Sequence, residues 1–133
     1  MKKMRKKNNK GFSLVELIVV VLIMGIIAVA LAPQIMKWVQ TSRENTDKNQ
    51  IATIKATAQT AVAEWMEKNT APQGDYEIGA LTGTDETTFA GLLKLRLGEE
   101  PTPANGGKFY VHVSSTGVVT VDKTAGAGAP ATP

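Results

Sequence analysis

The chain has 133 residues and no cysteine, so disulfide bonds, thiolate nucleophiles and lipid-modified cysteines are excluded. Its net charge of +3 is unevenly distributed, because six of the fifteen basic residues precede Phe12 and none of the twelve acidic residues does. Beyond Gly11 the chain holds nine basic and twelve acidic residues, a balance of −3. Such a mildly acidic remainder argues against a general nucleic-acid-binding surface.

Residues 1–11 form a basic leader, and the apolar stretch that follows is long enough to cross a membrane. Leu14 to Ala32 comprises 19 residues, among which Glu16 is the only charged one, and a transmembrane helix needs about 20 residues. By the positive-inside rule, the basic leader stays in the cytoplasm and everything after Ala32 is exported. The sequence therefore predicts a single-pass protein of the cell membrane with a cytoplasmic N-terminus.

An ordinary secretory signal peptide is the simplest alternative for residues 1–32, because Ala30-Leu31-Ala32 has the pattern of a cleavage site. Three observations count against it. The apolar stretch is longer than usual, a simple signal gains nothing from the carboxylate of Glu16, and Pro33 would follow the cut. An unprocessed single-pass anchor is the other alternative.

One long helix is predicted over residues 12–68, in two parts. Residues 12–33 are apolar on all sides, as a membrane-crossing helix requires. Residues 34–68 are amphipathic, with an apolar stripe at helical spacing that consists of Ile51, Ile54, Ala58, Ala61, Val62, Trp65 and Met66. The breaker cluster of residues 69–74 ends the helix.

A small head, residues 69–123, is predicted to follow and to begin with a short helix. Thr84-Asp85-Glu86 offers an N-cap and an acidic first turn for this helix, which continues through residues 89–97. Gly98 stands directly after it, where a C-capping glycine is expected.

The head is predicted to end in a β-hairpin, which makes the fold class α+β. Residues 108–113 and 118–122 alternate in polarity on either side of a turn. One face of the hairpin, with Phe109, Val111 and Val113, is expected to pack on the stripe of the long helix. Residues 124–133 are rich in Gly, Ala and Pro and are expected to be a disordered tail.

The most specific signal lies where the apolar stretch begins. The run Lys10-Gly11-Phe12-Ser13-Leu14-Val15-Glu16 is a basic leader that ends in Gly and continues as Phe-Ser-Leu-x-Glu into an apolar helix. It resembles the prepilin signature of type IV pilins and the related pseudopilins. The resemblance is highly specific over residues 10–33, weaker to residue 68 and nearly absent beyond. It implies a type IV pilin-like fold, although the lack of cysteine departs from many Gram-negative pilins, which close a C-terminal loop with a disulfide.

The resemblance implies a structural subunit that is made as a prepilin. A membrane-embedded prepilin peptidase would cleave the bond between Gly11 and Phe12 and N-methylate Phe12. The subunit would first reside in the membrane and then polymerise through its apolar helix into a cell-surface pilus. Its implied partners are copies of itself, the prepilin peptidase, an assembly ATPase and an inner-membrane platform protein.

Glu16 is expected to set the register between subunits. A lone carboxylate in a membrane-crossing segment costs about 2.5–3.5 kcal/mol on insertion scales, which indicates that the charge has a function. Cleavage would create an amine at Phe12, and Glu16 of one subunit could pair with the amine of another. The family assigns this residue the same assembly role. The alternative is a carboxylate that reaches the cytoplasmic interface without a partner.

Gly25 and Pro33 are candidate helix-breaking residues. Pro33 has no N–H, so the carbonyl of Val29 loses its helical donor and the helix should bend there. In the family, the segment between such Gly and Pro positions can melt on assembly. The alternative is a simple kink at the membrane surface.

Two further functions stay open at this point. The first is a pseudopilin of a type II secretion or DNA-uptake system, and the second is a non-polymerising, membrane-anchored binding module. An enzyme is not expected, because no nucleophile–base pair is visible in the sequence.

No cofactor or metal is expected either. His112 is read as a solvated strand residue that faces away from the core. Calcium in the head loops is a minor alternative, because acidic residues are available without EF-hand spacing: Asp75, Glu77, Asp85, Glu86, Glu99, Glu100 and Asp122.

Overall fold

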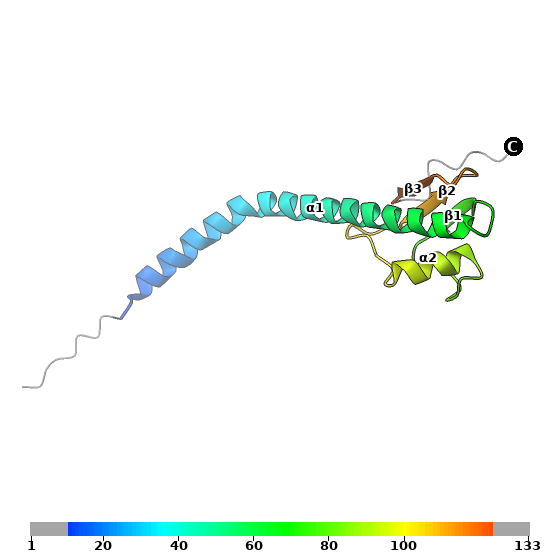
Figure 1. Cartoon of the computed structure of the whole chain (residues 1–133). Coiled ribbons are helices and arrows are strands. Elements are labelled where there is room, and N and C mark those ends of the chain that lie inside the picture. The colour runs from blue at the N-terminus through cyan, green and yellow to red at the C-terminus, as the bar shows by residue number, and fades with distance from the viewer. Residues whose placement is uncertain (1–10, 124–133) are drawn as a thin grey trace, which may run out of the picture. The chain divides into compact units, whose positions relative to one another are not determined.

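The computed structural model describes residues 11–123 (Figure 1). These residues fall into two compact units, which divide between Val39 and Gln40. Helix α1 (Leu14–Met66) contributes to both units and is the long helix predicted over residues 12–68. Residues 1–10 of the predicted leader and the predicted disordered tail, residues 124–133, lie outside the described residues.

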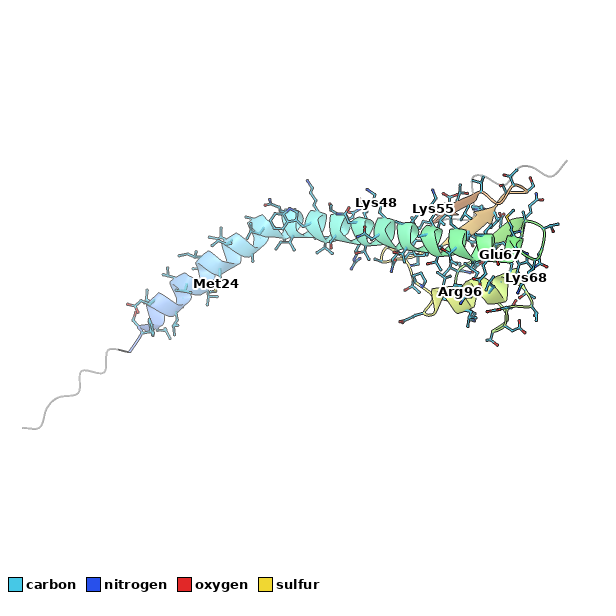
Figure 2. The ribbon with its side chains drawn as sticks, in the orientation of Figure 1. Met24, Lys48, Lys55, Glu67, Lys68 and Arg96 are labelled. Carbon is cyan, nitrogen blue, oxygen red and sulfur yellow. The ribbon has the colours of Figure 1, made fainter. Side chains whose placement is uncertain are left out.

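In the first unit, α1 carries apolar side chains on all sides, and Figure 2 shows them projecting freely around Met24. Every large hydrophobic residue from Phe12 to Val39 is exposed, with exposed fractions between 43% for Leu31 and 86% for Phe12. Within the described residues, α1 is the one helix long and apolar enough to cross a membrane. The helix continues without interruption through Gly25 and Pro33.

The second unit contains a three-stranded antiparallel sheet and the short helix α2 (Phe89–Leu97), packed against the second half of α1. In the view of Figure 1, the sheet and α2 lie on different sides of this half of α1. The apolar stripe predicted on α1 supplies the core, because Ile54, Ala58 and Ala61 are completely buried. Met66, which was also assigned to the stripe, is 43% exposed. The predicted α+β, type IV pilin-like fold class is thus confirmed.

The sheet has the strand order β1-β2-β3, with β1 (Gly74–Glu77), β2 (Tyr110–Val113) and β3 (Val119–Asp122). Strands β2 and β3 are the predicted hairpin, and β1 is a third strand that the sequence analysis did not predict. The hairpin face with Phe109, Val111 and Val113 is buried in the core, as expected.

Helix α2 begins later than predicted. Its N-cap is Thr88 rather than Thr84-Asp85-Glu86, and the Thr88 hydroxyl accepts a hydrogen bond from the backbone N–H of Gly91 at 3.1 Å. The first turn therefore starts at Phe89, which buries its ring in the core. At the other end, Gly98 has a φ of +68° and donates its N–H to the carbonyl of Lys94 at 3.0 Å, as the C-cap prediction requires.

A buried carboxylate on α1 joins the distant parts of the second unit. Asp47, which is 4% exposed, accepts hydrogen bonds from the backbone N–H of Ala104 at 2.6 Å and from the ammonium of Lys123 at 2.7 Å. The hydrogen bond from Lys123 is the main reason why the pKa of Asp47 lies below its usual range. Asp47 therefore holds the loop before β2 and the residue after β3 against the helix.

Replacing this carboxylate should weaken the fold in a pH-dependent way. Because the pKa of Asp47 is lowered on folding, its contribution is present above the pH at which a free aspartate titrates and is lost as the pH falls. We expect Asp47→Asn to lower the thermal unfolding midpoint of the detergent-solubilised chain at pH 7, and the difference from wild type to shrink toward pH 3. The control Glu67→Gln changes an exposed carboxylate in the turn directly after the same helix. A gap between wild type and Asp47→Asn that stays constant with pH would contradict this role.

Gly91 is the position in α2 where a side chain has no room. A Cβ there would collide with the backbone carbonyl of Asp85 and lie 3.1 Å from the Thr88 hydroxyl. We expect Gly91→Ala to destabilise the chain by about 1–3 kcal/mol, the usual cost of overpacking, measured by thermal unfolding. The matched control is Gly25→Ala, whose Cβ would meet nothing within 4 Å and should stabilise the helix by about 0.5–1 kcal/mol. Equal unfolding midpoints for the two variants would contradict the close approach.

Candidate functional site

The start of α1 is built as a capping box, formed by Ser13 and Glu16. The hydroxyl of Ser13 accepts a hydrogen bond from the N–H of Glu16, and the carboxylate of Glu16 accepts one from the N–H of Ser13, both at 3.3 Å. The carbonyl of Ser13 accepts the first helical bond, from the N–H of Leu17 at 3.3 Å. Two N–H groups that a helix N-terminus leaves unpaired are thereby satisfied.

This arrangement gives Glu16 a partner inside its own chain. The sequence predicted either a partner in another subunit or a carboxylate that reaches the cytoplasmic interface without one, and it did not predict this contact within the chain. The signal was present in Ser13-Leu14-Val15-Glu16, since S-x-x-E before an apolar run is the capping-box pattern. A carboxylate in the first turn also interacts favourably with the helix dipole, which offsets part of the cost of a charge beside an apolar helix. The role of Glu16 in register between subunits stays a prediction.

The bond between Gly11 and Phe12 lies in the irregular segment directly before α1. Residues 11–13 are all exposed, and the Phe12 side chain is 86% exposed. A Cβ at Gly11 would meet nothing within 4 Å, so packing within this chain does not require glycine there. A requirement for glycine at position 11 would therefore come from a partner that binds this segment closely. Cleavage at this bond and methylation of Phe12 stay predictions.

One face of the apolar part of α1 forms a shallow groove that includes Gly25. A Cβ at Gly25 would meet no atom of the chain, so the backbone of another helix can approach closely at this point. The groove is lined by Leu14, Leu17, Ile18, Val21, Leu22, Gly25, Ile26 and Val29. These residues follow helical spacing, which suits a second helix laid along the same face.

In the second unit, the environment of His112 differs from the prediction. The ring faces away from the core as expected, but the residue is only 9% exposed and is not a solvated strand residue. Its Nδ1 contacts the carboxylate of Asp75 on β1, and its Nε2 lies 3.6 Å from the carboxylate of Asp122 on β3. Because Asp75 is the cross-strand partner of His112, the imidazole joins all three strands and has a structural role.

Other acidic residues of the second unit are held by basic partners. Glu64 on α1 accepts a hydrogen bond from the Nε of Arg96 on α2 at 2.9 Å, and this bond holds the pKa of Glu64 below its usual range. Glu77 contacts the ammonium of Lys108, which lowers the pKa of Glu77. Within residues 11–123, no three His, Cys, Asp or Glu side chains gather in a way that could hold a metal ion.

Comparison with known proteins finds a family match at the N-terminus of the chain. Residues 6–32 match the family described as the prokaryotic N-terminal methylation motif. Two fimbrial proteins of Pseudomonas aeruginosa are each 31% identical to this chain over 81 residues, which cover 59% of this chain and 53% of the relative. The chain thus spans about half the length of the curated relatives that it matches. No solved structure matches the chain.

These findings confirm the resemblance to type IV pilins and pseudopilins. The methylation motif covers the capped start of α1, the exposed bond before it and the apolar part of the helix. The fold places that helix on a small α+β head, as the resemblance implies. The chain therefore carries an N-terminal methylation motif and is similar to type IV pilins in this region and in fold.

Proposed function

We propose that this chain is a structural subunit of a type IV pilus, made as a prepilin and polymerised through the apolar part of α1. The observation that carries the proposal is that this part of the helix is exposed on all sides and adjoins an exposed Gly11–Phe12 bond within a methylation motif. The chain itself offers no partner for this surface among the described residues. Lipid is the partner before assembly, and neighbouring copies are the partner afterwards.

Cleavage after Gly11 gives Glu16 a partner that the precursor lacks. The new amine of Phe12, with a pKa of about 8 for a free terminal amine, stands one residue before the capping box. Within one subunit, the carboxylate of Glu16 is engaged by the N–H of Ser13. A neighbour shifted along the helix axis would present its amine to this carboxylate, and a buried ion pair of this kind specifies register more than stability. Repetition of the same shift gives an open helical fibre.

Cleavage and polymerisation also imply the other partners of the protein and its location in the cell. A prepilin peptidase cleaves and methylates the chain, and an assembly ATPase acts through an inner-membrane platform protein. The N-terminus is cytoplasmic before processing, and the mature subunit is part of a surface pilus. The protein is structural and not an enzyme.

A pseudopilin of a type II secretion or DNA-uptake system is the second candidate. The observation that favours it is the absence of cysteine, since the disulfide-closed C-terminal loop of many Gram-negative pilins is then missing. A pseudopilin would be processed in the same way but would stay with the membrane fraction when surface filaments are sheared off.

The cleavage site is tested by changing Gly11. We expect Gly11→Val to leave the intact precursor in the membrane, because a branched side chain next to the scissile bond would obstruct a close-fitting protease cleft. Gly11→Ala, which adds only a methyl group, is the matched control and should be processed at least partly. The mobility of the protein on denaturing gels separates precursor from product. Normal processing of Gly11→Val would contradict the assigned site.

The role of Glu16 is tested by separating its charge from its capping function. Glu16→Gln keeps an acceptor for the N–H of Ser13 and removes the charge, whereas Ser13→Ala keeps the charge and removes the cap. As the sole subunit, Glu16→Gln should be processed but enter sheared filaments at least about tenfold less than wild type, and Ser13→Ala should assemble. Wild-type assembly of Glu16→Gln, or equal loss in both variants, would sink the register proposal.

A further inference from the structure

A pocket in the second unit lies between α1 and the segment that follows α2, and its volume is about 310 Å³. Residues of α1 between Thr46 and Thr57 form one wall, and Leu97, Glu99 and Pro101 belong to the other. Glu99 is the one charged residue of the lining. The methylation motif, which ends at residue 32, includes none of these residues.

Hydroxyl oxygens on the α1 wall are available as hydrogen-bond acceptors. The hydroxyl groups of Thr46 and Thr53 donate to the carbonyls of Ser42 and Asn49, one helical turn earlier, both at 3.0 Å. A hydroxyl that has used its single hydrogen in this way can only accept from a further partner. This wall therefore suits a ligand that brings its own donors.

Glu99 supplies a negative charge that its own chain does not neutralise within the described residues. It is exposed, and Lys94 pairs instead with the neighbouring Glu100 at 3.4 Å. Beside it, Leu97 and Pro101 are only partly buried and offer apolar surface. A lysine side chain matches such a pocket, because it combines an apolar stem with an ammonium group that has three donors.

Two lysines with these properties lie on the other side of α1. Lys48 and Lys55 are exposed, and neither makes an ion pair in the part of the chain that the structure describes. They are seven residues apart, so they follow one another along one helix face, and at 3.6 residues per turn each is rotated by roughly 140–160° from Thr53. Figure 2 shows both on the side of α1 away from Arg96. We call Lys48 and Lys55 the lysine pair.

The side of the second unit that carries α2 has an excess of negative charge. Residues 85–100, which comprise α2 and its flanks, hold four acidic and two basic residues. Asp85 belongs to this side, because its carbonyl lies against Gly91 of α2. Glu86 does as well, because its carboxylate is 3.7 Å from Arg96. The pocket thus lies on the acidic side of α1, and the lysine pair lies on the opposite side.

We propose that the pocket at Glu99 binds an ammonium group of the lysine pair of a second copy of this chain. Charge complementarity favours this occupant, because a contact between two pockets would oppose two carboxylates. Within one copy, the pocket and the lysine pair are separated by α1. The contact is heterologous, since it joins one side of α1 to the opposite side in the next copy, and such contacts add subunits in one direction. It rests on the proposed function, which lays copies side by side along α1, and adds a polar contact between their heads.

A zero-length carbodiimide cross-linker tests the contact in filaments sheared from cells, because it forms an amide between a carboxylate and a lysine amine that touch. Mass spectrometry of the covalent dimer should find Glu99 joined to Lys48 or Lys55. The matched control combines Lys48→Arg and Lys55→Arg, which keeps both charges and removes the amines. These filaments should assemble and lose the Glu99 cross-link. Wild-type filaments in which Glu99 is joined to neither lysine would overturn the proposal.

Charge reversal tests whether the contact contributes to assembly. As the sole subunit, Glu99→Lys should yield at least about fivefold less sheared filament than wild type, and so should the combination of Lys48→Glu and Lys55→Glu. A chain with all three changes should recover about half of the wild-type yield or more, because opposite charges face each other again. The control Glu67→Lys changes an exposed carboxylate outside the pocket and should assemble like wild type. Normal assembly of Glu99→Lys, or no recovery in the triple variant, would overturn the proposal.

Failure of this contact is distinguishable from failure of the proposed function. A wild-type chain that stays in the membrane and yields no sheared filament would contradict the proposed function and would overturn the contact with it. Wild-type filaments that assemble without the Glu99 cross-link would overturn the contact alone.

Discussion

The constraint on which the rest of the structure depends is that the first part of α1 has no partner among the described residues of its own chain. Its leucine, isoleucine and valine side chains are exposed on all sides. Exposure of such an apolar surface to water is energetically unfavourable. The helix therefore needs lipid or other apolar helices around it. The second part of α1 has the opposite character, because the centre of its apolar stripe, Ile54, Ala58 and Ala61, is completely buried in the core. A single helix thus serves as a membrane-competent surface over one length and as the centre of a core over the next.

The charge at the start of this apolar surface has a local and a proposed function that use the same carboxylate. In the chain as described, Glu16 completes the cap of α1 with Ser13. In the proposed precursor, which would have no amine at Phe12, this cap would offset part of the cost of the carboxylate. In the proposed filament, the amine of a neighbour would be added to an acceptor that the cap has already oriented. The cap accordingly supports the register function and does not replace it.

Sequence periodicity was sufficient to predict the long helix, the buried stripe on it and the hairpin, since each has its own repeat along the chain. Strand β1 was missed because Gly74-Asp75-Tyr76-Glu77 has no apolar alternation and is a strand only through pairing with the distant β2. Asp47 and His112 were missed for the same reason, since their partners lie far along the sequence. At the candidate site, the apolar helix was predicted from sequence, and Gly11, Phe12 and Glu16 were named there as candidate residues. The capping-box pattern of Ser13 and Glu16 was also present in the sequence, but Glu16 was interpreted only as a charged residue.

The most direct measurement is the intact mass of this protein from cells, compared between the membrane fraction and material sheared from the surface. A processed and exported pilus subunit would appear in the sheared material as a chain that begins at N-methylated Phe12. A chain that retains residues 1–11 and is confined to the membrane, in cells that contain the peptidase, would contradict the account. In that case the exposed apolar helix would serve only as an anchor.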